Sequence, residues 1–155
     1  MTIDNIAAHG FQTGHVGLNV SDLARSRDFY RRIFGFELMG QSEEDGRRYA
    51  FLGDQQKLIL TLWQQGEGRF ERARPGLHHL SFQVGSIEQV RAVEGKLRAD
   101  GVRLLHDGVV PHAEGAASGG VFFEDPDGIR LEVYSPTGAE GLHAPTAGAP
   151  SCGFF

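Results

Sequence analysis

The stretch FFEDPDGIRLEVY at residues 122–134 decides the fold prediction, because the chain carries a second version of it. It aligns without gaps to FLGDQQKLILTLW at residues 51–63, an offset of 71 residues. Each copy alternates in the manner of two strands joined by a tight turn. In the later copy the turn is Asp125-Pro126-Asp127-Gly128, with proline and glycine at positions that a type I turn favours. We expect Gly53 and Gly128 at the two hairpin turns.

An earlier pair of blocks repeats in the same order. HVGLNV at residues 15–20 aligns to HLSFQV at residues 79–84, an offset of 64 residues. Helix signals follow each block, predicting one helix from the cap Asp22 to Gly35 and another from the cap Ser86 to Gly101. Each unit therefore reads strand, helix, strand, strand, turn, strand. The seven extra residues of the second unit fall in the glycine- and alanine-rich segment 111–120.

This duplication divides the chain into four parts. Residues 1–13 form a polar lead-in, module one spans 14–72, and module two spans 77–136. The remaining residues, 137–155, are rich in glycine, alanine and proline and lack periodicity, so we expect an extended or mobile tail. Its apolar end could dock on a neighbouring surface. The two modules together predict a single α+β domain from 14 to 136.

Composition narrows the class of protein. Fifteen Lys or Arg against 20 Asp or Glu among 155 residues give a formal charge of −5, which argues against nucleic-acid binding. Cys152 is the one cysteine, so no intramolecular disulfide can form, as expected for a cytoplasmic protein. The sequence shows neither a signal peptide nor an apolar run of about 20 residues, so we expect no membrane span.

The duplication groups four positions into one candidate site. His15 and His79 begin the opening strands of the two modules, and Thr61 and Glu132 lie at the centres of the closing strands. Alternation turns Glu132 away from its apolar neighbours, toward the concave face of the sheet. A carboxylate inside a cavity is costly to desolvate unless a charged partner or a metal ion compensates it.

Two histidines and one carboxylate form a ligand set that suits Fe(II) and accepts Mn, Zn, Ni or Co. We therefore predict one divalent metal ion bound by His15, His79 and Glu132. Taken singly, each of the three residues is more often an ordinary surface or hydrogen-bonding side chain, and only their matched positions favour ligation. Candidate substrate-binding residues are those at matched strand positions or beside the inserted loop: Thr61, Trp63, Phe122, Tyr134 and His112.

These motifs resemble the vicinal oxygen chelate superfamily, which includes glyoxalase I, bleomycin resistance proteins, fosfomycin resistance transferases and extradiol dioxygenases. The resemblance covers roughly residues 13–136 and is most specific in the block 123–134. It implies two βαβββ modules that form a cupped, partly open mixed sheet with helices outside. It also implies metal ligands at His15, His79 and Glu132, with Glu132 a candidate base, and a homodimer whose sites are shared between chains.

Two departures narrow the activity. Glyoxalase I has an acidic fourth ligand where this chain has Thr61, which argues against a true glyoxalase I. Extradiol dioxygenases have a tyrosine where this chain has Phe122. The resemblance thus leads us to expect a metal-dependent enzyme of the lyase, dioxygenase or transferase type, whose small substrate chelates the metal through vicinal oxygens. The alternative is a non-catalytic protein of the bleomycin resistance type, which sequesters a drug-like or aromatic ligand.

Overall fold

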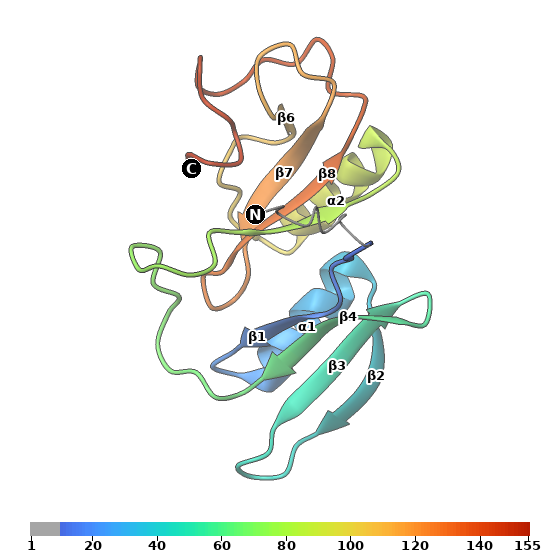
Figure 1. The fold of residues 1–155 in the computed structure, drawn as a ribbon, viewed down its shortest axis with the longest axis vertical. Helices are drawn as coiled ribbons and strands as arrows, with labels where there is room; N and C mark the ends of the chain where they lie inside the picture. Colours follow the sequence, from blue (N-terminus) through green and yellow to red (C-terminus); the bar gives the residue numbers. More distant parts are fainter. Residues whose placement is uncertain (1–9) are drawn as a thin grey trace, which may run out of the picture.

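The computed structural model describes residues 10–155 and confirms two modules of identical topology (Figure 1). Both modules pair their first strand in parallel with their last and then continue antiparallel. The sheet orders are β1-β4-β3-β2 and β5-β8-β7-β6. Module one contains β1 (Val16–Asn19), α1 (Leu23–Phe34), β2 (Glu37–Ser42), β3 (Tyr49–Asp54) and β4 (Lys57–Trp63). Module two contains β5 (Leu80–Gln83), α2 (Ile87–Ala99), β6 (Val110–Pro111), β7 (Gly119–Glu124) and β8 (Arg130–Ser135).

The predicted α+β class and βαβββ modules are thus confirmed. Each module supplies a separate four-stranded half of the expected cupped sheet, and among residues 10–155 no strand pair joins the two halves. Residues 10–13 of the lead-in form no helix or strand, and residues 1–9 lie outside the described residues. Neither α1 nor α2 is long and apolar enough to span a bilayer.

The helices begin where their caps predict. The Asp22 carboxylate accepts a hydrogen bond from the Arg25 amide at 3.0 Å, and Gly35 ends α1 at a φ of 72°. That left-handed conformation suits glycine because it lacks a Cβ atom. The Ser86 hydroxyl accepts from the Gln89 amide at 3.3 Å and starts α2. This helix ends at Ala99 with Asp100 as its cap, so the cap lies one residue before the predicted Gly101.

The hairpin of module one departs from the sequence prediction. Gly53 is still within β3, opposite Leu58, and the turn is made by Gln55 and Gln56 at positive φ angles of 48° and 66°. A glycine is needed at 53 for a different reason, since a Cβ there would lie 2.6 Å from the Lys57 carbonyl oxygen. The placement of Gly53 in the turn is therefore wrong, whereas Gly128 does lie in its turn, at a φ of 88°.

Each helix covers one face of its own sheet, and the two helices also contact each other. Leu60 and Leu62 of β4 and Leu131 and Val133 of β8 are buried in the shared core. Aromatic rings from both modules meet there, with the Phe34 and Phe82 ring centroids 4.7 Å apart. Strand alternation then turns the residues between these core positions onto the sheet faces that point away from the helices.

The Asp125–Gly128 turn of module two docks on α1 of module one. The Tyr30 hydroxyl donates a buried hydrogen bond to the Asp125 carboxylate at 2.8 Å. The other carboxylate oxygen of Asp125 accepts from the amides of Asp127 and Ile129 at 2.8 and 2.9 Å. This single side chain therefore shapes its own turn and joins it to the neighbouring module.

Asp127 adds a second link between the modules. Its carboxylate accepts from the Ser21 amide at 3.0 Å and from the Arg25 guanidinium at 2.9 Å. The Ser21 hydroxyl also hydrogen-bonds to it. The start and the middle of α1 are therefore both held to this turn. Together these contacts set the orientation of module two relative to module one.

We predict that Tyr30→Phe lowers the free energy of unfolding by about 1–3 kcal/mol, because it leaves one buried oxygen of Asp125 without its donor. Urea denaturation followed by circular dichroism would measure the loss. Tyr49→Phe is the matched control, since the Tyr49 ring packs at the outer face of module one. Equal stability of Tyr30→Phe and the parent protein would contradict this role.

The stability contribution of Asp125 should depend on pH. Burial raises the pKa of Asp125 despite the hydrogen bonds that it accepts from Ile129, Tyr30 and Asp127. Because the folded pKa is raised, the contribution is complete below the unfolded pKa of about 3.9 and declines as pH rises through the folded value. The unfolding free energy of the parent should therefore fall relative to that of Asp125→Asn as the pH rises from about 4 toward neutrality.

Urea titrations of both proteins across that range test the sign. Asp107→Asn, which alters a fully exposed carboxylate, should show no such trend. A difference between the parent and Asp125→Asn that stays constant or grows with rising pH would show that Asp125 is not held in this way.

Candidate functional site

Glu132 is the centre of the candidate site. It lies in the middle of β8, between Phe122 of β7 and Ser81 of β5, on the sheet face away from α2. The residue is only 2% exposed. A carboxylate buried to this degree needs hydrogen-bond or charge partners to offset its desolvation.

Two imidazoles supply those partners, one for each carboxylate oxygen. His79, directly before β5, places its Nε2 atom 3.4 Å from Glu132 Oε2. His112, directly after β6, hydrogen-bonds through Nε2 to Glu132 Oε1. The His112 Nδ1 atom lies 2.7 Å from the Ser118 hydroxyl, which fixes the ring from its other side.

The electrostatics around His79 favour its neutral form. Burial is the main cause that lowers the pKa of His79, and the charges of His78 and Arg130 lower it further. The negative charge of Glu132 opposes this shift without cancelling it. A neutral imidazole keeps a lone pair available, which is the form that binds metal ions. The predicted pair His79 and Glu132 is therefore brought together in a state suited to ligation.

The predicted site residues of module one lie in or directly before strands of the other sheet. His15 is exposed directly before β1, and Thr61 is buried in β4 on the sheet face away from α1. The Thr61 hydroxyl accepts a hydrogen bond from the Trp63 indole at 3.0 Å. Within residues 10–155 of a single chain, no group of three or more His, Cys, Asp or Glu side chains is placed to hold a metal ion.

The candidate substrate-binding residues divide between the same two faces. On module one, the Trp63 ring lies 5.5 Å from Tyr49 and 5.8 Å from Phe51, forming an aromatic patch beside Thr61. On module two, Phe122 and Tyr134 flank His112, with ring centroids 6.4 and 5.2 Å away. The predicted residues therefore form two groups, the candidate half-sites, one on each outer sheet face.

The sequence prediction was incomplete for two residues of this face. His112 was predicted as a residue beside the inserted loop that contacts the substrate or supports the site, and the structure makes it a direct partner of Glu132. The residues inserted between β6 and β7 place it there. The apolar end of the tail was predicted to dock on a neighbouring surface, and the Phe155 ring does so, 5.2 Å from Phe122 and 6.1 Å from His79. Its position beside Glu132 and His79 was not predicted.

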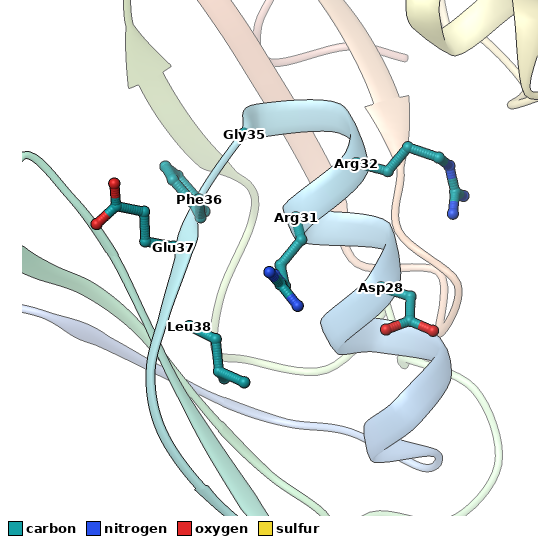
Figure 2. Close-up of a pocket in the computed structure, with 7 residues that line it drawn as sticks. All are labelled: Asp28, Arg31, Arg32, Gly35, Phe36, Glu37 and Leu38. Carbon is teal, nitrogen blue, oxygen red and sulfur yellow. The ribbon is translucent and has the colours of Figure 1, made fainter.

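A broad hollow of about 850 Å³ lies away from these residues, beside the end of α1 (Figure 2). Its charged side chains are two acidic and two basic residues, and the Arg32 guanidinium is already paired with Asp100. None of its lining residues is a histidine or belongs to the predicted site. The lining residues are Asp28, Arg31, Arg32, Gly35, Phe36, Glu37 and Leu38. The predicted site residues are therefore not part of this hollow.

Comparisons with known proteins place this architecture among relatives of different activities. The chain is 31% identical over 129 residues to a lactoylglutathione lyase of Escherichia coli O157:H7, covering 77% of this chain and 88% of that one. It is 30% identical over 135 residues to a trivalent organoarsenical cleaving enzyme of Bacillus sp. (strain MD1), covering 85% and 80%.

A solved structure of similar fold is the glyoxylase/bleomycin resistance protein/dioxygenase domain from Frankia sp. EAN1pec. It is 27% identical, with a TM-score of 0.69, over 81% of this chain and 97% of that one. The family model for the Glyoxalase/Bleomycin resistance protein/Dioxygenase superfamily matches residues 12–133, which include module one and all but the last three residues of module two. With its duplicated βαβββ fold and this match, the chain belongs to the Glyoxalase/Bleomycin resistance protein/Dioxygenase superfamily.

Proposed function

We propose that the protein is a divalent-metal-dependent enzyme acting on a small substrate that binds the metal through two neighbouring oxygens. His79 and Glu132 of one chain would hold the ion together with His15 of a second copy. The observation that carries this proposal is the buried Glu132 carboxylate, which lies on an outer sheet face with His79 beside it. A homodimer would bring the two half-sites together across that face.

The donor atoms on module two fit a metal ion. Two ligands that each lie about 2.0–2.2 Å from one ion in tetrahedral or octahedral geometry are roughly 3.0–3.5 Å apart. His79 Nε2 and Glu132 Oε2 are 3.4 Å apart. One is a neutral imidazole and the other a carboxylate, a combination that suits Fe(II), Mn, Zn, Ni or Co. The bound ion would supply Lewis acidity for a substrate that carries adjacent oxygens.

The protein's own residues divide the remaining work. His112 holds Glu132 Oε1, so the other oxygen stays directed toward His79. Because a carboxylate can only accept, His112 Nε2–H donates to Glu132 and stabilises its ionised form, the form in which Glu132 could act as a base. Phe122 and Tyr134 line the same face and exclude water from the carboxylate. A lower effective dielectric there strengthens every charge interaction in the site.

The reaction is of the lyase, dioxygenase or transferase type. Two relatives of nearly equal identity, a lactoylglutathione lyase and an organoarsenical cleaving enzyme, catalyse different reactions. The shared fold therefore does not select one of them. Thr61 argues against a true glyoxalase I, because its hydroxyl cannot replace an anionic fourth ligand and already accepts from Trp63.

A second candidate function is sequestration of an aromatic or drug-like ligand without turnover. The aromatic patch of Tyr49, Phe51 and Trp63 on module one supports this alternative. The two functions differ in one respect that can be measured. Sequestration predicts that an aromatic ligand still binds after His79→Ala, whereas the metal-dependent enzyme predicts that substrate binding is lost.

We predict about one divalent ion per chain in protein loaded with Mn or Ni, measured by plasma mass spectrometry after desalting. His79→Ala and Glu132→Gln should each weaken metal affinity at least tenfold by calorimetric titration, because each removes a ligand. His143→Ala is the control, since the His143 side chain is 89% exposed and pairs with Glu114, and neither residue belongs to the predicted metal site. Less than about 0.1 ion per chain, with no rise in melting temperature on metal addition, would refute metal binding.

Sharing of the site between chains can be tested by complementation. Co-expression of differently tagged His15→Ala and Glu132→Ala chains should yield a heterodimer that binds one metal ion. Its intact site would combine His15 of one chain with His79 and Glu132 of the other. The homodimer of His15→Ala chains and the homodimer of Glu132→Ala chains should each bind no metal ion. A monomer in sedimentation, or a heterodimer without metal, would show that the site is not shared in this way.

A further inference from the structure

Residues 151–155 lie across the outer face of module two. Ser151, only 2% exposed, anchors the segment. Its amide donates to the His112 carbonyl at 2.8 Å, and its hydroxyl donates to the Pro111 carbonyl at 2.6 Å. The His106 ring donates through Nε2 to the Ser151 carbonyl at 2.8 Å. Figure 1 shows the end of the chain on the same side of the molecule as β6 and β7.

The anchor holds the Phe155 ring against the site. Its centroid lies 5.2 Å from that of Phe122, 5.6 Å from His106 and 6.1 Å from His79. The Arg130 guanidinium carbon lies 5.1 Å from the centre of the same ring. The preceding Phe154 is 65% exposed. Of two adjacent identical side chains, only Phe155 is surrounded by partners.

The surroundings of Phe155 favour an aromatic ring in particular. Three imidazoles, those of His106, His79 and His78, approach it nearly edge-on, at interplanar angles of 82°, 77° and 72°, a geometry that the quadrupole of an aromatic ring prefers. The Arg130 cation is attracted to the ring face, an interaction that a saturated group of the same size does not offer. Arg130 is held in place because its Nε donates to the His78 carbonyl at 2.9 Å.

We propose that Phe122, His106, His79 and Arg130 form an aryl-binding subsite, which Phe155 occupies as an internal stand-in for a ligand. The ligand class is a small molecule that carries an aromatic ring. Because His79 also contacts Glu132, such a ring would place its polar substituents beside the carboxylate. This inference deepens the proposed function by naming a substrate class for the same site. The tail and the ligand ring compete for one position.

Chemical modification without added metal tests the position of the tail. Removing the Phe155 ring should uncover His79 and His106. Their rates of carbethoxylation by diethyl pyrocarbonate, followed by peptide mass spectrometry, should rise at least threefold in Phe155→Ala. Phe154→Ala is the matched control and should leave both rates unchanged, with exposed His143 as the internal standard. Equal rates in Phe155→Ala and the parent would overturn the proposal.

Ligand binding, again without added metal, tests the subsite. A ligand that must displace Phe155 can bind only those molecules in which the subsite is open. Its apparent affinity is therefore reduced in proportion to the fraction of such molecules. The probe 3-phenylpropionate should therefore bind Phe155→Ala at least fivefold more tightly than the parent, by titration monitored with NMR. Its saturated analogue, 3-cyclohexylpropionate, should bind that variant at least threefold more weakly than 3-phenylpropionate. Equal affinities for parent and variant, or for the two acids, would overturn the proposal.

A third variant and the metal titration distinguish failure of the aryl-subsite proposal from failure of the metal-site proposal. Phe155→Leu keeps an apolar group but removes the ring, so it should behave as an intermediate between the parent and Phe155→Ala. Because neither assay contains added metal, positive results would stand even if the protein bound no ion. Conversely, stoichiometric metal binding with unchanged modification and probe affinity would retain the metal site and reject the aryl subsite.

Discussion

The arrangement of the whole molecule depends on the buried contact between the Asp125–Gly128 turn and helix α1. Asp125 receives the Tyr30 hydroxyl and two amides of its own turn, while Asp127 holds Ser21 and Arg25. Burial of these polar groups is tolerable only because they satisfy one another. The contact fixes the β7–β8 hairpin against the neighbouring module, and the helices then occupy the inner faces of both sheets. The outer faces are not covered by the helices.

That arrangement places the predicted site residues of the two modules on separate sheet faces. His15 and Thr61 belong to the outer face of one sheet, and His79 and Glu132 to the outer face of the other. Burying the Glu132 carboxylate requires partners, and His79 and His112 provide one for each oxygen. Phe155 then covers the same face. The module-two half-site is thus organised around one buried charge and is covered by the chain's own tail.

The sequence allowed much of this to be predicted because the relevant signals are local. Helix starts follow from the caps Asp22 and Ser86, and the proximity of His79 and Glu132 follows from strand alternation in duplicated blocks. The hairpin of module one could not be predicted in the same way. An irregular register between Leu52 and Gly53 moves the turn to Gln55 and Gln56, and no residue-type preference signals that shift.

By itself, the sequence determined the duplicated βαβββ units and the face on which Glu132 lies, since caps and period-two alternation depend only on neighbouring residues. The tertiary structure alone decided which distant residues meet that carboxylate. The contact with His112 depends on the path of the loop before β7, and the covering by Phe155 depends on the Ser151 anchor. The separation of His15 from Glu132 depends on how the contact between the Asp125–Gly128 turn and α1 orients one module relative to the other. Such contacts join residues far apart along the chain, and no local periodicity encodes them.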